Sequence, residues 1–337
     1  MKKLRYWFEF VFVSFFAWLI PLLPLPLLHG IAKLLGWIVY HLDRKSQAVA
    51  LANLEAAFGE KYTSKERKLI ARRSVQVFAR SFLELFWTPR LNRENIDRYI
   101  RIADEEKFNN WFLLSKRGAI IVAVHFANFE WTAAQGGIRG YKGYVLMQRF
   151  KNDRLTPIFR RIREAAGQSS TTQEKSMVRF FKALKRGAPV GMLSDLTLKM
   201  SDPAVILRTF DGLHMRATMM PAALQQRTQC PIFPIFTLPE KGGYTFHVMD
   251  PIEYSPSASI QEISQACWDR WEALIREHPE QWLWSYKHWR YRAPVDSDRY
   301  PFYANRSELF DAEFNQMSVS RQTTGETRPD LEEKLKP

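Results

Sequence analysis

The stretch Gly118-Ala-Ile-Ile-Val-Ala-Val-His-Phe-Ala-Asn-Phe-Glu130 joins an apolar run to a histidine and an acid. Residues 119–124 are all apolar and rich in β-branched side chains, which predicts a strand buried on both faces. His125 stands where this strand ends. Asn128 is a good N-cap for a helix that starts at once and covers 129–135. The sequence therefore places a titratable side chain at a junction between a strand and a helix.

The spacing of His125 and Glu130 suggests acid–base chemistry. On a regular helix, five residues turn through about 500° and would separate the two side chains. If the pair instead straddles the strand end and the first helical turn, both face one cleft. Glu130 can then hold one imidazole nitrogen while the other takes a proton from a substrate. A purely structural hydrogen bond is the competing interpretation, because the pattern is short and common.

Strand and helix patterns alternate along the chain around this stretch. Further strands are expected at 144–147, 189–194 and 231–238, and Gly242-Gly243 predicts a hairpin into an antiparallel partner at 244–249. Helices are expected at 47–58, 65–87 (capped by Ser64), 104–115, 153–166, 175–185, 217–227 and 260–277. The fold class predicted is α/β, with a largely parallel mixed sheet and helices on both faces. Functional residues of such sheets gather at the carboxyl ends of strands, where both His125 and Asp195 lie.

The first 42 residues predict a membrane anchor. Lys2, Lys3 and Arg5 precede an apolar run over 7–20, and a second apolar run covers 31–42. A signal peptide is disfavoured because no clear cleavage site follows the first run. A helix over 4–20 would extend about 25 Å, slightly short of a hydrocarbon core of about 30 Å, so a spanning and an interfacial helix both remain open.

Composition limits the remaining possibilities. A folded α/β domain is expected over 43–295, followed by a polar tail over 296–337 that turns highly charged beyond Ser318. The two cysteines, Cys230 and Cys267, exclude a disulfide framework and a Cys-rich metal site, and they fit a reducing compartment. The histidines show no ligand spacing, so no metal is expected. No Gly-x-Ser-x-Gly elbow or Gly-rich phosphate loop occurs either.

The formal net charge of +14 implies an anionic partner. Between residues 139 and 163 Asp153 is the only acid. No zinc-finger, helix-turn-helix or RNP pattern supports nucleic acid, so acidic lipid or an acidic protein is expected. The basic residues of this cluster are Arg139, Lys142, Arg149, Lys151, Arg154, Arg160, Arg161 and Arg163.

Several of these motifs together resemble the bacterial lipid A biosynthesis acyltransferases, the lauroyl and myristoyl transferases of the lysophospholipid-acyltransferase-like superfamily. The resemblance covers roughly residues 1–292. Its strongest parts are His125-x4-Glu130, Pro189-Val-Gly-Met-Leu-Ser-Asp195 and His278-Pro-Glu-Gln-Trp-Leu-Trp284, with weaker echoes at Arg149-x-x-Asn152 and Phe210-Asp-Gly212.

Three motifs depart from the family pattern. The family usually has Asp-Gln where this chain has Asp195-Leu196, and Phe-Phe-Gly where it has Phe210-Asp211-Gly212. It also tends to show a His and two Arg before the last Trp, where this chain has Ser285-Tyr-Lys-His-Trp289. These departures leave the reaction class in place and the identity of the acceptor lipid open.

The resemblance implies a glycerolipid acyltransferase-like fold and acyl transfer from a thioester to a lipid hydroxyl. The donor would be acyl carrier protein or coenzyme A, a cosubstrate, with no resident cofactor. A thioester is already activated, so no covalent enzyme intermediate is needed. The helix start at Asn128-Phe129 offers backbone donors for an oxyanion.

Further site residues follow from the same resemblance. Arg149 matches a family position and is expected to contact an anionic group, with Asn152 beside it and Arg161 or Arg163 assisting. Asp195 would orient an acceptor hydroxyl or pair with an arginine, or else form a structural salt bridge. Glu280 would bridge to an arginine, unless 279–284 only packs. Three tryptophans, Trp282, Trp284 and Trp289, are candidates for the lipid boundary.

The leading hypothesis is a membrane-bound O-acyltransferase for a glycolipid, most simply a lipid A precursor, at the cytoplasmic face of the cell inner membrane. Acyl carrier protein is the expected protein partner. Another anionic or sugar lipid as acceptor is the alternative within this class. A non-catalytic, basic membrane-binding protein on the same scaffold is the alternative outside it, disfavoured by the presence of both His125 and Glu130.

Overall fold

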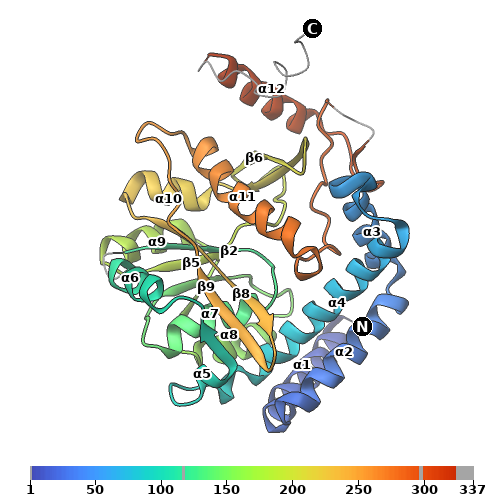
Figure 1. Ribbon diagram of the computed structural model, residues 1–337, viewed down its shortest axis with the longest axis vertical. Helices are drawn as coiled ribbons and strands as arrows, with labels where there is room; N and C mark the ends of the chain where they lie inside the picture. The colour runs from blue at the N-terminus through green and yellow to red at the C-terminus, as the bar shows by residue number, and fades with distance from the viewer. Residues whose placement is uncertain (1, 116–117, 296–298, 324–337) are drawn as a thin grey trace.

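The computed structural model describes residues 2–115, 118–295 and 299–323, and it is built around a seven-stranded sheet (Figure 1). The strand order is β1-β9-β8-β2-β5-β3-β4. All pairings are parallel except that between β8 and β9, which is the predicted hairpin. The strands are β1 (Ile100–Ile102), β2 (Ile120–Ala123), β3 (Tyr144–Met147), β4 (Ser169–Thr172), β5 (Val190–Leu193), β8 (Ile232–Glu240) and β9 (Gly243–Val248).

Helices cover both faces of this sheet, which confirms the predicted fold class (Figure 1). Side chains of the central strand β2 alternate between two cores. Ile120 and Val122 pack with α3, α9, α10 and α11, whereas Ile121 packs with α2, α4, α7 and α8. The helices are α3 (Arg44–Phe58), α4 (Ser64–Trp87), α5 (Ile96–Tyr99), α6 (Glu105–Ser115), α7 (Phe129–Ile138), α8 (Leu155–Glu164), α9 (Ser176–Lys185), α10 (Met220–Thr228) and α11 (Ile260–Glu277).

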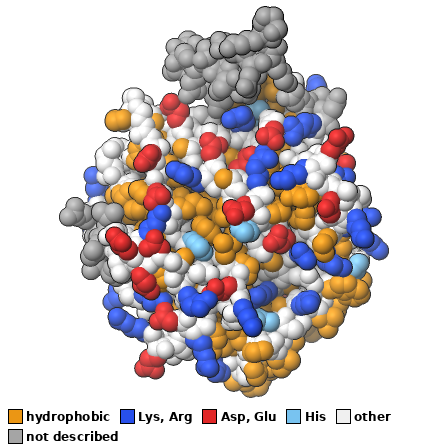
Figure 2. Space-filling model, in the orientation of Figure 1, with side chains coloured by type: hydrophobic (Ala, Val, Ile, Leu, Met, Phe, Trp, Pro, Cys, Tyr) orange, Lys and Arg blue, Asp and Glu red, His pale blue; other side chains and the backbone are white. Residues whose placement is uncertain are grey.

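Two apolar helices precede the sheet domain, α1 (Lys2–Leu19) and α2 (Leu25–Leu42). Both are long and apolar enough to cross a membrane, judged by length and composition alone. One face of α2 packs on α4, and Gly36 brings the two backbones together. Figure 2 shows apolar side chains gathered where α1 and α2 lie. The most exposed large apolar residues of the two helices are Leu4, Phe8, Phe12, Trp18, Leu34 and Leu42.

Two local predictions were wrong. Thr63, not Ser64, caps α4, because its side chain and that of Glu66 form a reciprocal capping box. The helix expected at 217–227 starts only at Met220, because the residues before it form β7 (Leu213–Thr218). This strand pairs antiparallel with β6 (Ala204–Thr209) in a separate hairpin that local helical propensity does not reveal.

The C-terminal part of the chain packs on the domain. Trp282, Trp284 and Trp289 are fully buried, so the suggestion that they lie at a lipid boundary was wrong. Within the segment expected to be a polar tail, α12 (Glu308–Thr323) buries Phe310 and Phe314. Residues 296–298 and 324–337 of that segment lie outside the described residues.

The contact between α2 and α4 predicts opposite effects for two glycine substitutions on one helix. A Cβ at Gly36 would lie 2.6 Å from Cα of Gln76, whereas a Cβ at Gly30 meets nothing within 4 Å. Gly36→Ala should lower the free energy of unfolding by about 1–3 kcal/mol through overpacking. Gly30→Ala should raise it by up to about 1 kcal/mol through helix propensity. Unfolding in detergent micelles measures both, and a stabilised Gly36→Ala protein would contradict this close packing.

Candidate active site

His125 is held at the end of β2 by a buried carboxylate. Its Nδ1 lies 2.8 Å from Oδ1 of Asp195, and its backbone N–H donates to Oδ2 over 2.9 Å. The indole N–H of Trp282 donates to the same Oδ2, also over 2.9 Å. Asp195 is 0% exposed, whereas His125 keeps part of its surface open to a cavity. The carboxylate therefore fixes both the ring and the backbone of the histidine, and it leaves Nε2 for chemistry.

The chain around His125 is shaped by contacts from the segment after α11. Phe126 forms a bridge with Trp282, and the N–H of Ala127 donates to the carbonyl of Gln281 over 2.8 Å. Ala127 adopts a left-handed conformation, φ 46°, which turns the chain sharply. The side chain of Asn128 then caps α7 by accepting from the N–H of Trp131, as predicted. The 279–284 segment thus acts as a packing element that supports the loop carrying His125.

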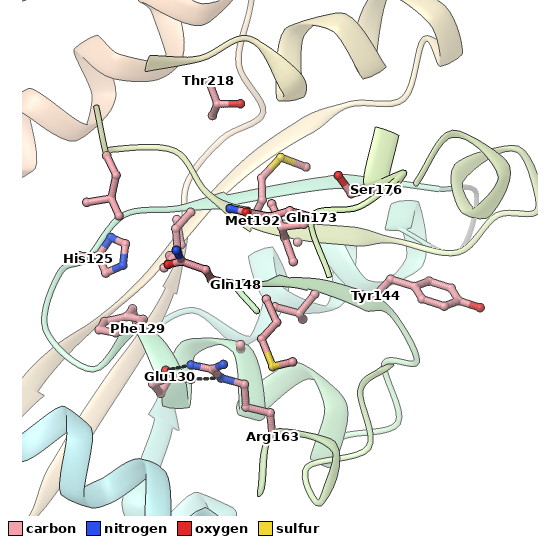
Figure 3. Close-up of a pocket in the computed structure, with 18 of the residues that line it drawn as sticks. His125, Phe129, Glu130, Tyr144, Gln148, Arg163, Gln173, Ser176, Met192 and Thr218 are labelled. Atoms are coloured by element: carbon pink, nitrogen blue, oxygen red, sulfur yellow. Dashed lines mark hydrogen bonds and ion pairs between the residues drawn. The ribbon is translucent and has the colours of Figure 1, made fainter. Parts of the chain in front are cut away.

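Glu130 does not hold the imidazole, so the predicted pairing was wrong. Its carboxylate accepts two hydrogen bonds from Arg163, from Nε over 2.9 Å and from Nη2 over 2.5 Å (Figure 3). Glu130 belongs to the first turn of α7, whereas His125 lies before the sharp turn at Ala127. Asp195 follows β5, the parallel neighbour of β2, and so its side chain reaches His125 directly.

The electrostatics favour an ionised Asp195 beside neutral His288. Burial would raise the pKa of Asp195, but the facing imidazole and hydrogen bond of His125 hold that pKa below its ordinary value. Burial lowers the pKa of His288 to about 4 against the attraction of Asp195. His288 stacks on Trp282 at 4.0 Å between ring centroids, and its Nε2 lies 2.7 Å from the carbonyl of Leu283. His288 thus supports the site as a neutral ring and does not take up a proton near neutral pH.

A second buried carboxylate, Glu84 on α4, ties the loop to the N-terminal helices. One of its oxygens accepts from His29 on α2 over 2.7 Å and from Arg80 over 2.9 Å. The other accepts from Asn128 over 2.7 Å and from the hydroxyl of Tyr244 over 2.6 Å. Burial and Glu84 both raise the pKa of Tyr244, so the phenol stays a donor. The residue that caps α7 is therefore connected through one carboxylate to α2.

His125 opens into a cavity of about 1030 Å³. Phe78 and Phe129 flank its ring, and the cavity wall continues along β3 and β5 (Figure 3). Apolar side chains dominate this wall, including Trp111, Val145, Met147, Met192 and Leu193. The polar exceptions include Gln148, Gln173, Arg163 and Glu130. A long apolar chain fits such a space, with polar groups near the histidine.

The structure brings only some of the predicted contact residues to this cavity. Arg163 and Arg149 line it, and the more exposed Arg149 pairs with Asp153 over 2.9 Å. Asn152 also lines it, but its amide binds α1. Arg161 is exposed and absent from the lining.

The remaining predicted contact, Glu280, also lies away from the cavity. It accepts from its neighbour Gln281 rather than from an arginine among the described residues. Across the part of the chain that the structure describes, no group of three or more acidic, Cys or His side chains is arranged to hold a metal.

Comparison with known proteins identifies the family. A sequence model of the bacterial lipid A biosynthesis acyltransferases matches residues 1–291. The chain belongs to this family. It is 24% identical over 307 residues to the lipid A biosynthesis lauroyltransferase of Escherichia coli (strain K12), an alignment that covers 88% of this chain and 95% of that protein. It is 23% identical over 308 residues to the lipid A biosynthesis acyltransferase 2 of Shigella flexneri, covering 88% and 94%. Membership supports acyl transfer to a lipid A-type acceptor by this acyltransferase.

The sequence predicted that His125 and Asp195 both lie at strand ends and that Asp195 contacts substrate or an arginine, or forms a structural salt bridge, but it did not predict that the two side chains pair. Both residues follow predicted parallel strands, and the pairing of neighbouring strand ends was the signal available. Glu84 was missed entirely, because an acid inside a long helix carries no local mark of burial.

The lowered pKa of His288 predicts loss of stability in mild acid. In the unfolded chain His288 becomes protonated near pH 6.5, whereas in the folded protein it stays neutral down to about pH 4. The free energy of unfolding therefore falls as pH falls through this window. The loss should reach up to about 3 kcal/mol by pH 4. The lowered pKa of Asp195 adds to this loss of stability only below about pH 4, the pKa of an aspartate in the unfolded chain.

Chemical unfolding at a series of pH values measures this effect. In His288→Gln the free energy of unfolding should change less with pH between 6.5 and 4, whatever the stability of the variant at pH 7. Half-buried His247, whose pKa burial also lowers, accounts for a smaller residual slope. An unchanged slope in His288→Gln would show that His288 is not the group responsible.

Proposed function

We propose that this protein is a membrane-bound O-acyltransferase that moves a fatty acyl chain from a thioester to a hydroxyl of a lipid A precursor. The observation that carries the proposal is the His125–Asp195 pair at the edge of a large apolar cavity. Nε2 of His125 removes the proton of the acceptor hydroxyl as its oxygen attacks the thioester carbonyl. Asp195 keeps Nδ1 protonated and stabilises the imidazolium that forms.

The oxyanion of the tetrahedral intermediate lies near the start of α7. The first N–H groups of a helix have no acceptor within it, and here Phe129 and Glu130 begin α7 four and five residues after His125. Collapse of the intermediate breaks the C–S bond, and the imidazolium returns its proton to the leaving thiolate. No covalent enzyme intermediate is required, since a thioester is reactive enough to be attacked directly.

Arg163 supplies positive charge to the same cavity. Its Nε and Nη2 bind Glu130 in a fork, which leaves Nη1 for a carbonyl or anionic oxygen of a substrate. The side chain of Glu130 is mostly buried, and this partner compensates for the burial of its charge. In this proposal Glu130 positions Arg163 and does not act on the imidazole.

The donor is a thioester of acyl carrier protein or coenzyme A, both of which are anionic. The body of the enzyme faces the cytoplasm at the inner membrane, because such thioesters are available there. One face of α2 packs along α4, which favours α2 remaining on the domain rather than crossing the bilayer alone. The apolar outer faces of α1 and α2 therefore favour immersion in one leaflet. The basic surface of the protein draws anionic lipid and an acidic carrier toward it.

Substitutions at the pair test the mechanism. His125→Ala and Asp195→Asn should each lower turnover about 10²- to 10⁴-fold in a purified assay with an acyl thioester and a lipid A precursor, because the base is lost or its tautomer is wrong. Asp250→Asn, at an exposed acid paired with Lys107, is the matched control and should keep its turnover. Mass spectrometry of the lipid product measures transfer.

Glu130→Gln separates the two possible partners of His125. In the proposed mechanism this substitution acts through Arg163. It should change the binding of acceptor or donor more than it changes the pH dependence of turnover. If Asp195→Asn keeps full turnover while Glu130→Gln loses turnover and shifts the acidic limb of the pH profile, where the imidazole becomes protonated, the imidazole works with Glu130 and the assignment of Asp195 is wrong.

A further inference from the structure

We propose that α1 forms a wall of the reaction cavity, and that Arg5 on this wall binds the anionic head group of the acceptor lipid. This inference rests on the proposed function, since it names the part of the same site that recognises the acceptor. Three residues in the first turns of α1, namely Arg5, Tyr6 and Glu9, line the cavity into which His125 opens. The helix is therefore part of the substrate site as well as a membrane contact.

A buried amide fastens α1 to the wall. Asn152 is 3% exposed, and its Nδ2 donates to the carbonyl of Tyr6 over 2.9 Å and to the carboxylate of Glu9 over 3.0 Å. The backbone carbonyl of Asn152 accepts from the N–H of Leu155 at the start of α8 over 3.0 Å. The residue thus joins the first turns of α1 to the loop that precedes α8.

This fastening is important because α1 is otherwise loosely attached. None of its residues is fully buried. Phe10, Val13 and Phe16 pack partly against the core, while the opposite side exposes Phe8, Phe12 and other large apolar residues. A helix with one side on the protein and the other on lipid forms a boundary between the bilayer and the cavity. A lipid in the bilayer can enter the cavity beside it without crossing water.

The charge at this boundary fits an anionic head group. Arg5 is 66% exposed and contacts Glu9 through Nε at 3.2 Å, which leaves its terminal nitrogens for a second anion. Oε1 of Glu9 faces Arg5 while Oε2 accepts from Asn152, so the carboxylate is held in one position beside the guanidinium. Lys151 and Arg149 line the same cavity from the facing loop. An arginine that can bind two oxygens at once suits a phosphate group at this place.

The test compares Arg5→Ala with Lys3→Ala in the full chain. Both substitutions remove one positive charge from the same turn of α1, but Lys3 does not line the cavity. Equilibrium binding of a phosphorylated glycolipid and of its dephosphorylated form is measured in mixed detergent micelles, and transfer to the phosphorylated form is measured in parallel. Partition of each variant into vesicles checks that membrane binding is unchanged.

Arg5→Ala should weaken binding of the phosphorylated form at least about tenfold, as expected for loss of a charge-assisted hydrogen bond, and leave the dephosphorylated form unchanged. Lys3→Ala should change either affinity less than twofold. Asn152→Ala, which removes no charge, should weaken binding of the phosphorylated form as well, because α1 is released from the wall.

The outcomes separate this inference from the proposed function. If the wild-type protein transfers acyl chains and Arg5→Ala matches Lys3→Ala, the acceptor is recognised elsewhere and the inference is overturned. If the wild-type protein binds the phosphorylated lipid through Arg5 without transferring an acyl chain, the proposed function fails and the binding site stands. Equal loss of both lipid forms in Arg5→Ala would also overturn the assignment of Arg5 to a head-group anion.

Discussion

The buried carboxylate of Asp195 is the constraint on which the arrangement of the site depends. It accepts from the imidazole and backbone of His125 and from the indole of Trp282, so three elements meet at two oxygen atoms. A buried charge is costly unless it is fully hydrogen-bonded, and these partners meet that requirement. The same contacts that keep the charge stable also fix the orientation of the His125 ring. The stability of the buried charge and the geometry around His125 therefore have one physical origin.

A second buried carboxylate extends this arrangement toward the membrane. Glu84 accepts from Asn128 at the start of α7 and from His29 on α2, so α2 and the loop that carries His125 share one hydrogen-bonded centre. The close packing of Gly36 on α4 acts in the same direction. The second apolar helix, α2, is thus built into the domain, whereas α1 is attached through Asn152.

The cavity combines features that suit two different parts of a lipid. Its walls along β3 and β5 are mainly apolar, whereas α1 and the loop before α8 bring charged side chains to its lining. Glu130 and Arg163 compensate each other on its wall, so the site holds charge near the base without an unpaired buried ion. In the proposed function, such a lining can hold an acyl chain and an anionic head group at the same time.

The sequence by itself determined the α/β class, most strand and helix positions, the two apolar helices and the place of His125 at a strand end. These features depend on local periodicity, capping and apolar runs, all of which involve residues close together in the sequence. Only the tertiary structure decided that Asp195 rather than Glu130 holds the imidazole, that Glu130 pairs with Arg163, and that Asn152 fastens α1. Each of these pairs joins residues 33 or more positions apart. Such contacts are set by strand order and helix packing, which local sequence patterns do not encode.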